Sequence, residues 1–186
     1  MSKVITEKVE TSAGRRSDCL HLIETIDSAG RASVDFVLPS GYFKYELVFD
    51  NVVPVTDAVE CWFRTSTDGG STFDSGASNY WWTQHYQYST SDLSVGSTGD
   101  TQIEIAYNIG NSTNESITGG ITVYNPSAAQ YTRVDWMSQG IRGDAVPTLF
   151  SGAGARLSAA DVNAIQVLFS SGNFSSGIFK LYGWVA

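Results

Sequence analysis

Hydrophobic and polar side chains alternate along much of the chain after residue 30. In residues 42–50, Phe43, Tyr45, Leu47 and Phe49 share one face of an extended segment, whereas the other face is largely polar. Alternation with a period of two is typical of a strand with one buried and one solvated face, as in antiparallel sheets. Nine strands are expected in this way, at residues 31–38, 42–50, 58–65, 77–88, 102–108, 116–124, 131–142, 162–169 and 178–185.

Short turns separate these segments. Pro39-Ser40-Gly41 ends the first predicted strand, and residues 51–57 are expected to form a crossing loop. Glycines outnumber prolines by 18 to 4, which predicts turns built with glycine. No sustained helical period is visible after residue 30. No repeat of about 20–50 residues is visible either, which argues against a propeller. The pattern predicts an all-β fold, an antiparallel β-sandwich, and favours a jelly roll.

Residues 1–30 differ from the remainder, because they hold many charges and few aromatic side chains. Residues 19–26 (CLHLIETI) are weakly periodic and fit either an alternating strand or a helical turn. We expect an N-terminal arm or edge strand at residues 1–30 that packs on a neighbour. One β-sandwich domain is expected to follow at residues 31–186.

The charge balance argues against nucleic acid as a partner. The formal net charge is −8, and the only basic pair is Arg15-Arg16, whereas phosphate binding needs clustered Lys and Arg. Only 16% of residues are charged, so the surface is expected to be rich in Ser, Thr, Asn, Gln and Gly. This composition is typical of all-β proteins displayed on surfaces.

The sequence shows no targeting signal, and its two cysteines do not indicate a metal site. The opening MSKVITEKVE lacks the apolar run of a signal peptide, and no stretch reaches the roughly 18 apolar residues of a membrane span. We therefore expect synthesis in a cytosol and no membrane partner. Cys19 and Cys61 lack metal-ligand spacing; free thiols are the favoured interpretation, and a disulfide between them is the alternative.

The segment STDGGSTF, residues 66–73, has the spacing of the Asp-box turn known from sialidase propellers. Asp68 is expected to accept hydrogen bonds from the backbone N–H groups two and three residues on, and Gly69 and Gly70 to supply positive φ angles. Ser66 and Thr72 are expected to pair their hydroxyls across a ladder, and Phe73 to cap the core. The segment contains Ser66, Asp68, Gly69, Gly70, Thr72 and Phe73. We interpret it as a structural hairpin turn that sets the register of the strands at 58–65 and 77–88.

The sequence contains few candidate catalytic residues. The only histidines are His21 and His85, and no nucleophile elbow appears. Asp68 and Asp74 are a weak candidate for Ca²⁺. Carboxylate pairs for glycoside hydrolysis would have to come from Glu60, Glu104, Glu115, Asp135 and Asp144. Because acidic residues on polar strand faces are usually just solvated, we expect no enzyme activity, no cofactor and no metal.

The segment NYWWTQHYQY, residues 79–88, is the strongest candidate for a contact surface. In a strand, Trp82, Tyr86 and Tyr88 share one face with Tyr80 and Gln84, and Trp81 lies on the other. Aromatic side chains with polar groups suit cores, subunit interfaces and sugar platforms. Core or interface is the favoured interpretation, and a sugar platform is the alternative. The candidate residues are Trp81, Trp82, Tyr86 and Tyr88.

Three stretches together resemble a family of tailed-bacteriophage virion proteins. They are YFKYELVFDNVVPVTD at residues 42–57, RTSTDGGSTF at 64–73 and SGNFSSGIFKLYG at 171–183. The resemblance covers residues 31–186 and implies a jelly-roll-like β-sandwich that is usually oligomeric. Such domains occur in tail fibres, tail-associated proteins and capsid decoration proteins. The resemblance implies no catalytic residues.

Three hypotheses follow. The first is a non-enzymatic virion structural protein, a capsid decoration (cement) or head or tail surface subunit, expected to be a homotrimer. It would contact other virion proteins, such as the major capsid or tail proteins, after synthesis in the host cytoplasm. The second is a carbohydrate-binding module of a tail fibre or spike that recognises a host surface glycan. The third, a glycan-degrading enzyme, is disfavoured.

Overall fold

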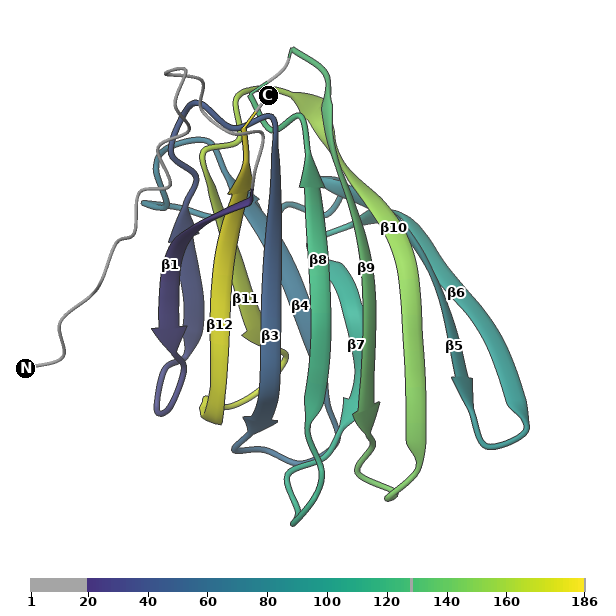
Figure 1. Ribbon diagram of the computed structural model, residues 1–186. Helices are drawn as coiled ribbons and strands as arrows, with labels where there is room; N and C mark the ends of the chain where they lie inside the picture. The colour runs from purple at the N-terminus through teal and green to yellow at the C-terminus, as the bar shows by residue number, and fades with distance from the viewer. Residues whose placement is uncertain (1–19, 128, 186) are drawn as a thin grey trace, which may run out of the picture.

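Two antiparallel β-sheets packed face to face make up the described part of the chain (Figure 1). The computed structural model describes residues 20–127 and 129–185. Those residues form twelve strands and contain no helix. The predicted all-β antiparallel sandwich is therefore confirmed, and the strand order is compatible with a jelly roll.

One sheet has eight strands and the other has four, so the larger sheet extends beyond the smaller one. The larger sheet contains, in spatial order, β1 (Leu20–Asp27), β12 (Phe174–Trp184), β3 (Lys44–Pro54), β8 (Ile117–Tyr124), β9 (Tyr131–Ile141), β10 (Pro147–Ala159), β5 (Tyr80–Tyr88) and β6 (Ser91–Asp100). The smaller sheet contains β2 (Ser33–Val37), β11 (Ala164–Phe169), β4 (Val59–Ser66) and β7 (Ile103–Ile109). Strands β1 and β6 form the two edges of the larger sheet (Figure 1).

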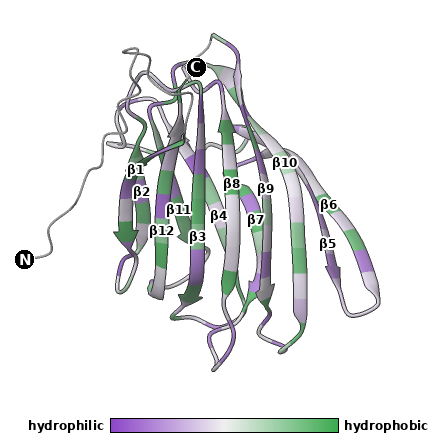
Figure 2. Cartoon of the chain, viewed as in Figure 1, coloured by the Kyte–Doolittle hydropathy of each residue, from purple (hydrophilic) through white to green (hydrophobic). Residues whose placement is uncertain are grey.

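The hydrophobic core lies between the two sheets. Colour alternates along many strands in Figure 2 because neighbouring side chains point to opposite faces. Leu47, Ile121 and Phe150 of the larger sheet are fully buried, and so are Phe63 and Ile165 of the smaller sheet. Removing this apolar surface from water is the main force that holds the sheets together.

Each of the nine strands expected from the alternation is present, and two further strands, β6 and β10, were not predicted. The sequence of β6 is SDLSVGSTGD, and all of it is exposed or half-buried. The sequence of β10 is PTLFSGAGARLSA, with glycine or alanine at five positions. Neither strand carries the apolar alternation by which the others were recognised.

Two predicted boundaries differ from the structure. Residues 51–57 were expected to be a crossing loop, yet β3 continues as a strand to Pro54, because Val52 is buried and pairs with Ile117. The segment at residues 1–30, expected to be an arm or edge strand before the sandwich domain, includes β1, which forms an edge of the larger sheet and pairs with β12 of the same chain. Residues 20–27 are therefore part of the sandwich, and residues 1–19 lie outside the described residues.

Candidate functional site

The segment at residues 66–73 closes around the carboxylate of Asp68. Asp68 Oδ1 accepts hydrogen bonds from the Ser66 hydroxyl at 2.7 Å and from the Thr72 backbone N–H at 2.9 Å. Asp68 Oδ2 accepts one from the Thr72 hydroxyl at 2.7 Å. The φ angles of Gly69 and Gly70 are +74° and +86°, as expected for these positions. A glycine turn organised by Asp68 is therefore present, but the backbone N–H bonded to the carboxylate belongs to Thr72, four residues on, and the Gly70 N–H donates to the Ser66 hydroxyl instead.

The hydrogen bonds of the turn differ in detail from the prediction. The hydroxyls of Ser66 and Thr72 were expected to bond each other across a ladder, but each donates to Asp68 instead. The side-chain and backbone hydrogen bonds from Thr72, followed by that from Ser66, lower the pKa of Asp68 to about 2. The carboxylate is ionised at neutral pH and its oxygens are occupied by the turn itself.

The turn does not belong to a β-hairpin, which corrects the sequence interpretation. Strand β4 pairs with β11 and β7 in the smaller sheet, whereas β5 pairs with β10 and β6 in the larger one. Residues 67–79 therefore carry the chain from one sheet to the other and set no register between β4 and β5. Local sequence predicts the turn, but it does not reveal which strands each neighbour will pair with.

The side chain of Asn163, next to β11 of the smaller sheet, forms two hydrogen bonds with the turn. Its Oδ1 accepts a hydrogen bond from the Gly69 N–H at 2.8 Å, and its Nδ2 donates to the Thr67 carbonyl at 3.2 Å. Further along the crossing segment, Arg156 donates from Nε to Asp74. Asp74 is thereby paired with a guanidinium, and no group of three His, Cys, Asp or Glu able to hold a metal occurs within residues 20–127 and 129–185.

The aromatic strand β5 divides its side chains between two faces as predicted. Tyr80, Gln84 and Tyr86 are buried on the side that faces the smaller sheet. Trp82 packs against the hydrophobic core from the same face, and its indole N–H donates to Asp100 at 3.0 Å. Trp81 lies on the opposite face and is 52% exposed. The four candidate aromatics therefore cannot form a single platform.

Tyr86 and Tyr88 form a stacked cluster with Tyr107 of β7, which the sequence did not connect to them. The ring of Tyr86 lies 5.9 Å from that of Tyr88 and 6.2 Å from that of Tyr107. The guanidinium of Arg142 lies 4.3 Å from the centre of the Tyr88 ring and 5.9 Å from that of Tyr107. Tyr107 is 40% exposed, so the cluster reaches the surface where β5 meets β7.

The carboxyl of Glu104 on β7 is half-buried. Desolvation raises the pKa of Glu104 on β7 to about 7, with smaller contributions from the charges of Glu60 and Asp100. Glu104 pairs in register with Trp62, and the Trp62 indole N–H donates to Glu60 at 2.8 Å. The structure thus brings Glu60 and Glu104 together, two of the five carboxylates that the sequence offered for glycoside hydrolysis.

The other three carboxylates have separate local partners. Glu115 accepts a hydrogen bond from the Ser112 N–H at 2.7 Å, and Asp135 accepts one from the Tyr124 hydroxyl at 2.8 Å. Asp144 forms an ion pair with Arg142 at 3.1 Å. These contacts hold loops and neighbouring strands.

Sequence reasoning missed a surface on the outer face of the larger sheet. A shallow hollow of about 490 Å³ crosses β3, β8, β9 and β10, and a second of about 500 Å³ adjoins it over β8, β9 and β10. Met137 and Val48 line the first hollow and Leu149 lines the second; all three are exposed, Met137 by 65%. The available signal was Val48 and Met137, two apolar residues at positions that the alternation assigns to the solvated face.

Two of the stretches that carry the resemblance, 42–57 and 171–183, contain β3 and β12, which pair with each other in the larger sheet. The Val55 N–H donates to the Asn173 carbonyl at 2.8 Å, which connects the stretches at 42–57 and 171–183. Asn111 Nδ2 donates to the Val55 carbonyl at 2.7 Å. No protein-family model matches the chain, and no curated protein matches it in sequence.

Two remaining expectations concern cysteine and the membrane. Cys61 is a buried free thiol whose pKa burial raises, and Cys19 lies outside the described residues. Within residues 20–127 and 129–185, no helix is long and apolar enough to cross a membrane.

Proposed function

We propose that the chain is a non-enzymatic, homo-oligomeric structural subunit of a tailed-bacteriophage virion, placed on the surface of the head or tail. It is synthesised in the host cytoplasm and held on the particle by contact with another virion protein, such as the major capsid protein. The outer face of the larger sheet is the attachment surface. The three motifs at residues 42–57, 64–73 and 171–183 support the assignment to virion proteins.

The observation that carries the proposal is the composition of that outer face. Val48, Gly120, Met137 and Ser151 are successive partners across β3, β8, β9 and β10. The row combines exposed apolar side chains with small residues. Charged side chains border it, since Lys180 pairs with Val48 and the carboxylates of Glu46 and Asp135 line the same hollow. An exposed apolar patch rimmed by polar and charged side chains is typical of a protein interaction site.

Purified phage particles provide the test. We expect quantitative mass spectrometry to detect the chain at a fixed copy number and cryo-microscopy to place it on the particle surface. Met137→Lys is expected to reduce the copy number at least tenfold, because it buries an unpaired charge in the contact. Val37→Lys, at an exposed valine of the smaller sheet, is the matched control and should be incorporated normally. Particles without the chain, or with full incorporation of Met137→Lys, would contradict the proposal.

A second candidate function, recognition of a host surface glycan, has one specific observation in its favour. The stacked rings of Tyr86, Tyr88 and Tyr107 reach the surface beside Arg142, and aromatic rings with polar neighbours suit sugar binding. A glycan array with the intact chain and with Tyr107→Ala tests it. Tyr131→Ala, at an exposed tyrosine on β9 outside the cluster, is the control. Binding that Tyr107→Ala leaves unchanged would exclude the cluster as the sugar site.

A further inference from the structure

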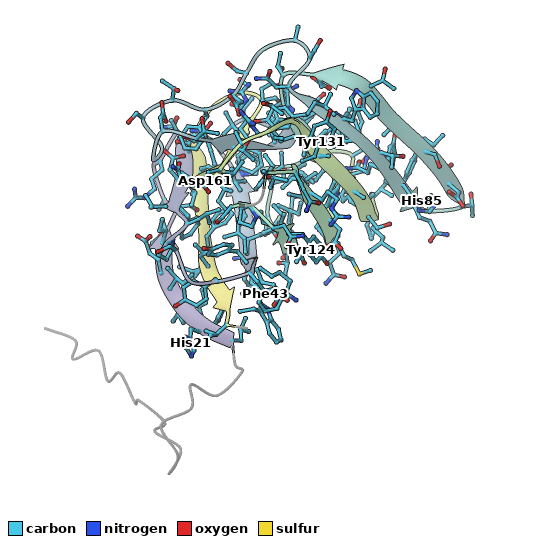
Figure 3. The ribbon with its side chains drawn as sticks, turned by 90° about the horizontal axis from the view of Figure 1, so that it is seen from above. His21, Phe43, His85, Tyr124, Tyr131 and Asp161 are labelled. Atoms are coloured by element: carbon cyan, nitrogen blue, oxygen red, sulfur yellow. The ribbon has the colours of Figure 1, made fainter. Side chains whose placement is uncertain are left out.

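The larger sheet ends in β6, whose outer edge has no partner strand among residues 20–127 and 129–185. In Figure 3, His85 on β5 lies at this end of the sheet, far from His21 on β1 at the opposite edge. Edge strands are usually protected by proline, lysine or a covering segment, because their free N–H and C=O groups attract another strand. The sequence of β6, SDLSVGSTGD, contains no Pro, Lys or Arg, so this edge is open to a further strand.

The edges formed by β7, β1 and β2 are less open. On β7, the backbone carbonyl of Glu104 already accepts a hydrogen bond from the Gln84 side chain at 2.9 Å. The pairing of β1 shifts register between Leu22 and Glu24, and β2 is only five residues long. Bulges and short edge strands both discourage the addition of another strand. Strand β6 is therefore the edge best suited to a strand contact.

The regular part of β6 is Ser91–Ser97, which pairs in unbroken register with β5. Tyr88 and Ser91 flank the two-residue turn and are directly paired, so they form a hydrogen-bonded pair across it. Hydrogen-bonded and non-hydrogen-bonded pairs alternate along an antiparallel ladder. Counting from Ser91, the residues whose N–H and C=O groups face away from β5 are Asp92, Ser94 and Gly96.

The sequence of this regular edge, SDLSVGS, is nearly symmetric about Ser94, with an apolar residue on each side and serine at both ends. When two copies pair antiparallel about a two-fold axis at Ser94, Leu93 of each copy lies opposite Val95 of the other. Leu93 is 41% exposed, and Val95 packs at the margin of the hydrophobic core. Both point to the inner face, since they pair with Tyr86 and Gln84, so this register extends the core across the axis.

The same register satisfies the backbone and keeps the charges apart. Ser94 faces its own copy and Asp92 faces Gly96, and because all three point outward, each pair exchanges two main-chain hydrogen bonds. The two Asp92 carboxylates lie four residue steps apart, about 13 Å, which exceeds the screening length of about 8 Å at physiological salt. Each Asp92 also contacts Nε2 of His85 in its own chain. Repulsion between the two strands is therefore weak.

The outline of the sandwich leaves room for the second copy. The larger sheet has eight strands and the smaller has four, and β5 and β6 extend beyond β7, the nearest edge of the smaller sheet (Figure 1). Two copies joined at β6 thus form one continuous sheet, and their smaller sheets remain separate on either side of the axis.

We propose that two copies pair through β6, with Ser91–Ser97 of one copy antiparallel to the same residues of the other about a two-fold axis at Ser94. The proposal rests on the homo-oligomer in the proposed function and names its subunit contact. It predicts a dimer in place of the homotrimer expected from the sequence. The axis runs perpendicular to the continuous sheet, so both outer faces point the same way. Both attachment surfaces then meet one particle surface, which strengthens attachment without a new kind of contact.

Variants of the full-length chain at Ser94 test the hydrogen bonds. Ser94→Pro removes the outward N–H of both copies at the axis, without removing a β5–β6 hydrogen bond. Ser94→Ala keeps the N–H and is the matched control. Multi-angle light scattering over a concentration series should show a dimer for the wild type and Ser94→Ala. For Ser94→Pro, dimerisation should require at least tenfold higher concentration, and circular dichroism checks that each variant folds.

Disulfide trapping tests the register, and it decides the matter if Ser94→Pro does not fold. The variants carry Cys19→Ser, and the remaining cysteine, Cys61, is buried. Ser91→Cys and Ser97→Cys should be trapped as a dimer only when the two chains are mixed, because Ser91 of one copy lies opposite Ser97 of the other. In either variant alone, the two thiols lie six residue steps apart, about 20 Å, which is too far for a disulfide.

The contrary outcomes are separable. A wild-type chain that stays monomeric at high concentration contradicts both the homo-oligomer and the β6 contact. A wild-type trimer, or an oligomer that survives Ser94→Pro, contradicts the β6 contact alone. Absence of trapping in the mixture, or equal trapping in Ser91→Cys alone, would overturn the two-fold register and with it the proposal.

Discussion

The two faces of the larger sheet are built from the same strands but differ in burial. Trp136 and Met137 are consecutive residues of β9; Trp136 is 3% exposed on the inner face and Met137 is 65% exposed on the outer face. Across the inner face, Leu47, Ile121 and Trp136 are paired neighbours and all are buried by the smaller sheet. Across the outer face, Val48, Gly120 and Met137 occupy the adjacent row without such a cover.

The difference teaches where the stability of the subunit resides. The inner row is fixed by packing, so its side chains are expected to determine the free energy of unfolding. The outer row lacks that constraint, so its side chains are free to serve contacts between proteins. A cluster of apolar residues at exposed strand positions is thus more informative about association than about folding.

The largest expected effect comes from truncating the two neighbours in β9. Trp136→Ala should lower the free energy of unfolding by about 3–5 kcal/mol, since it removes buried apolar surface and leaves a cavity. Met137→Ala should change it by less than about 0.5 kcal/mol. Urea denaturation of the isolated chain measures both. Similar losses for the two variants would remove the distinction between the faces.

Two glycines, one on each face of the larger sheet, extend this comparison with a smaller expected effect. A Cβ on Gly152 would lie 2.3 Å from Trp136 Cζ2 and 2.5 Å from the Thr83 carbonyl oxygen. Gly152→Ala should therefore destabilise the chain by about 2–3 kcal/mol through overpacking. Gly120→Ala is the matched control on the outer face, where the nearest atom to the new Cβ is the Leu47 carbonyl oxygen at 3.4 Å. Thermal unfolding of the pair should show a clear loss only for Gly152→Ala.

The same contact explains which strands the sequence could predict. Strands such as β3 and β4 place large apolar side chains at every second position, so their alternation predicts them. Strand β10 must leave room at Gly152 for the Trp136 ring of β9 and for the Thr83 carbonyl of β5, a strand distant in sequence. Strand β6 lies at an edge with few buried side chains, so its sequence does not need to alternate. Local pattern therefore predicted the packed strands and missed these two.

The candidate surfaces were predictable only in part. The turn around Asp68 is local, so its glycines and carboxylate could be recognised from spacing alone. The assignment of β4 and β5 to different sheets depends on long-range pairing that no short segment encodes. The stack of Tyr86 with Tyr107 likewise joins strands of different sheets and became visible only in the structure.

Glu104, on β7 of the smaller sheet, tests the cost of a desolvated charge. Its folded pKa, about 7, lies above the ordinary value of 4.5, so the folded state must ionise a desolvated carboxyl as pH rises. Stability should therefore fall between about pH 4.5 and 7 and remain lower above pH 7. Glu104→Gln should stabilise the chain by about 1–2 kcal/mol at pH 8 and by much less at pH 4.5. Glu24→Gln, at an exposed carboxylate of β1, controls for the loss of a charge. Chemical denaturation at both pH values measures the free energy of unfolding of each variant. An equal gain in stability for Glu104→Gln and Glu24→Gln at pH 8 would contradict the desolvation argument.

The smallest effect is expected at the turn that links the two sheets. The folded pKa of Asp68, about 2, lies below the ordinary value of 3.8, so its contribution is present above about pH 4 and is lost as pH falls toward 2. Asp68→Ala should lower the melting temperature slightly at pH 7, because Thr72 and Ser66 lose their acceptor, and the difference from wild type should shrink toward pH 2. Differential scanning calorimetry at a series of pH values measures this difference. Because the turn is exposed and its hydrogen bonds are local, the variant should still join the particle, and selective loss of incorporation at unchanged stability would assign the turn to a contact instead.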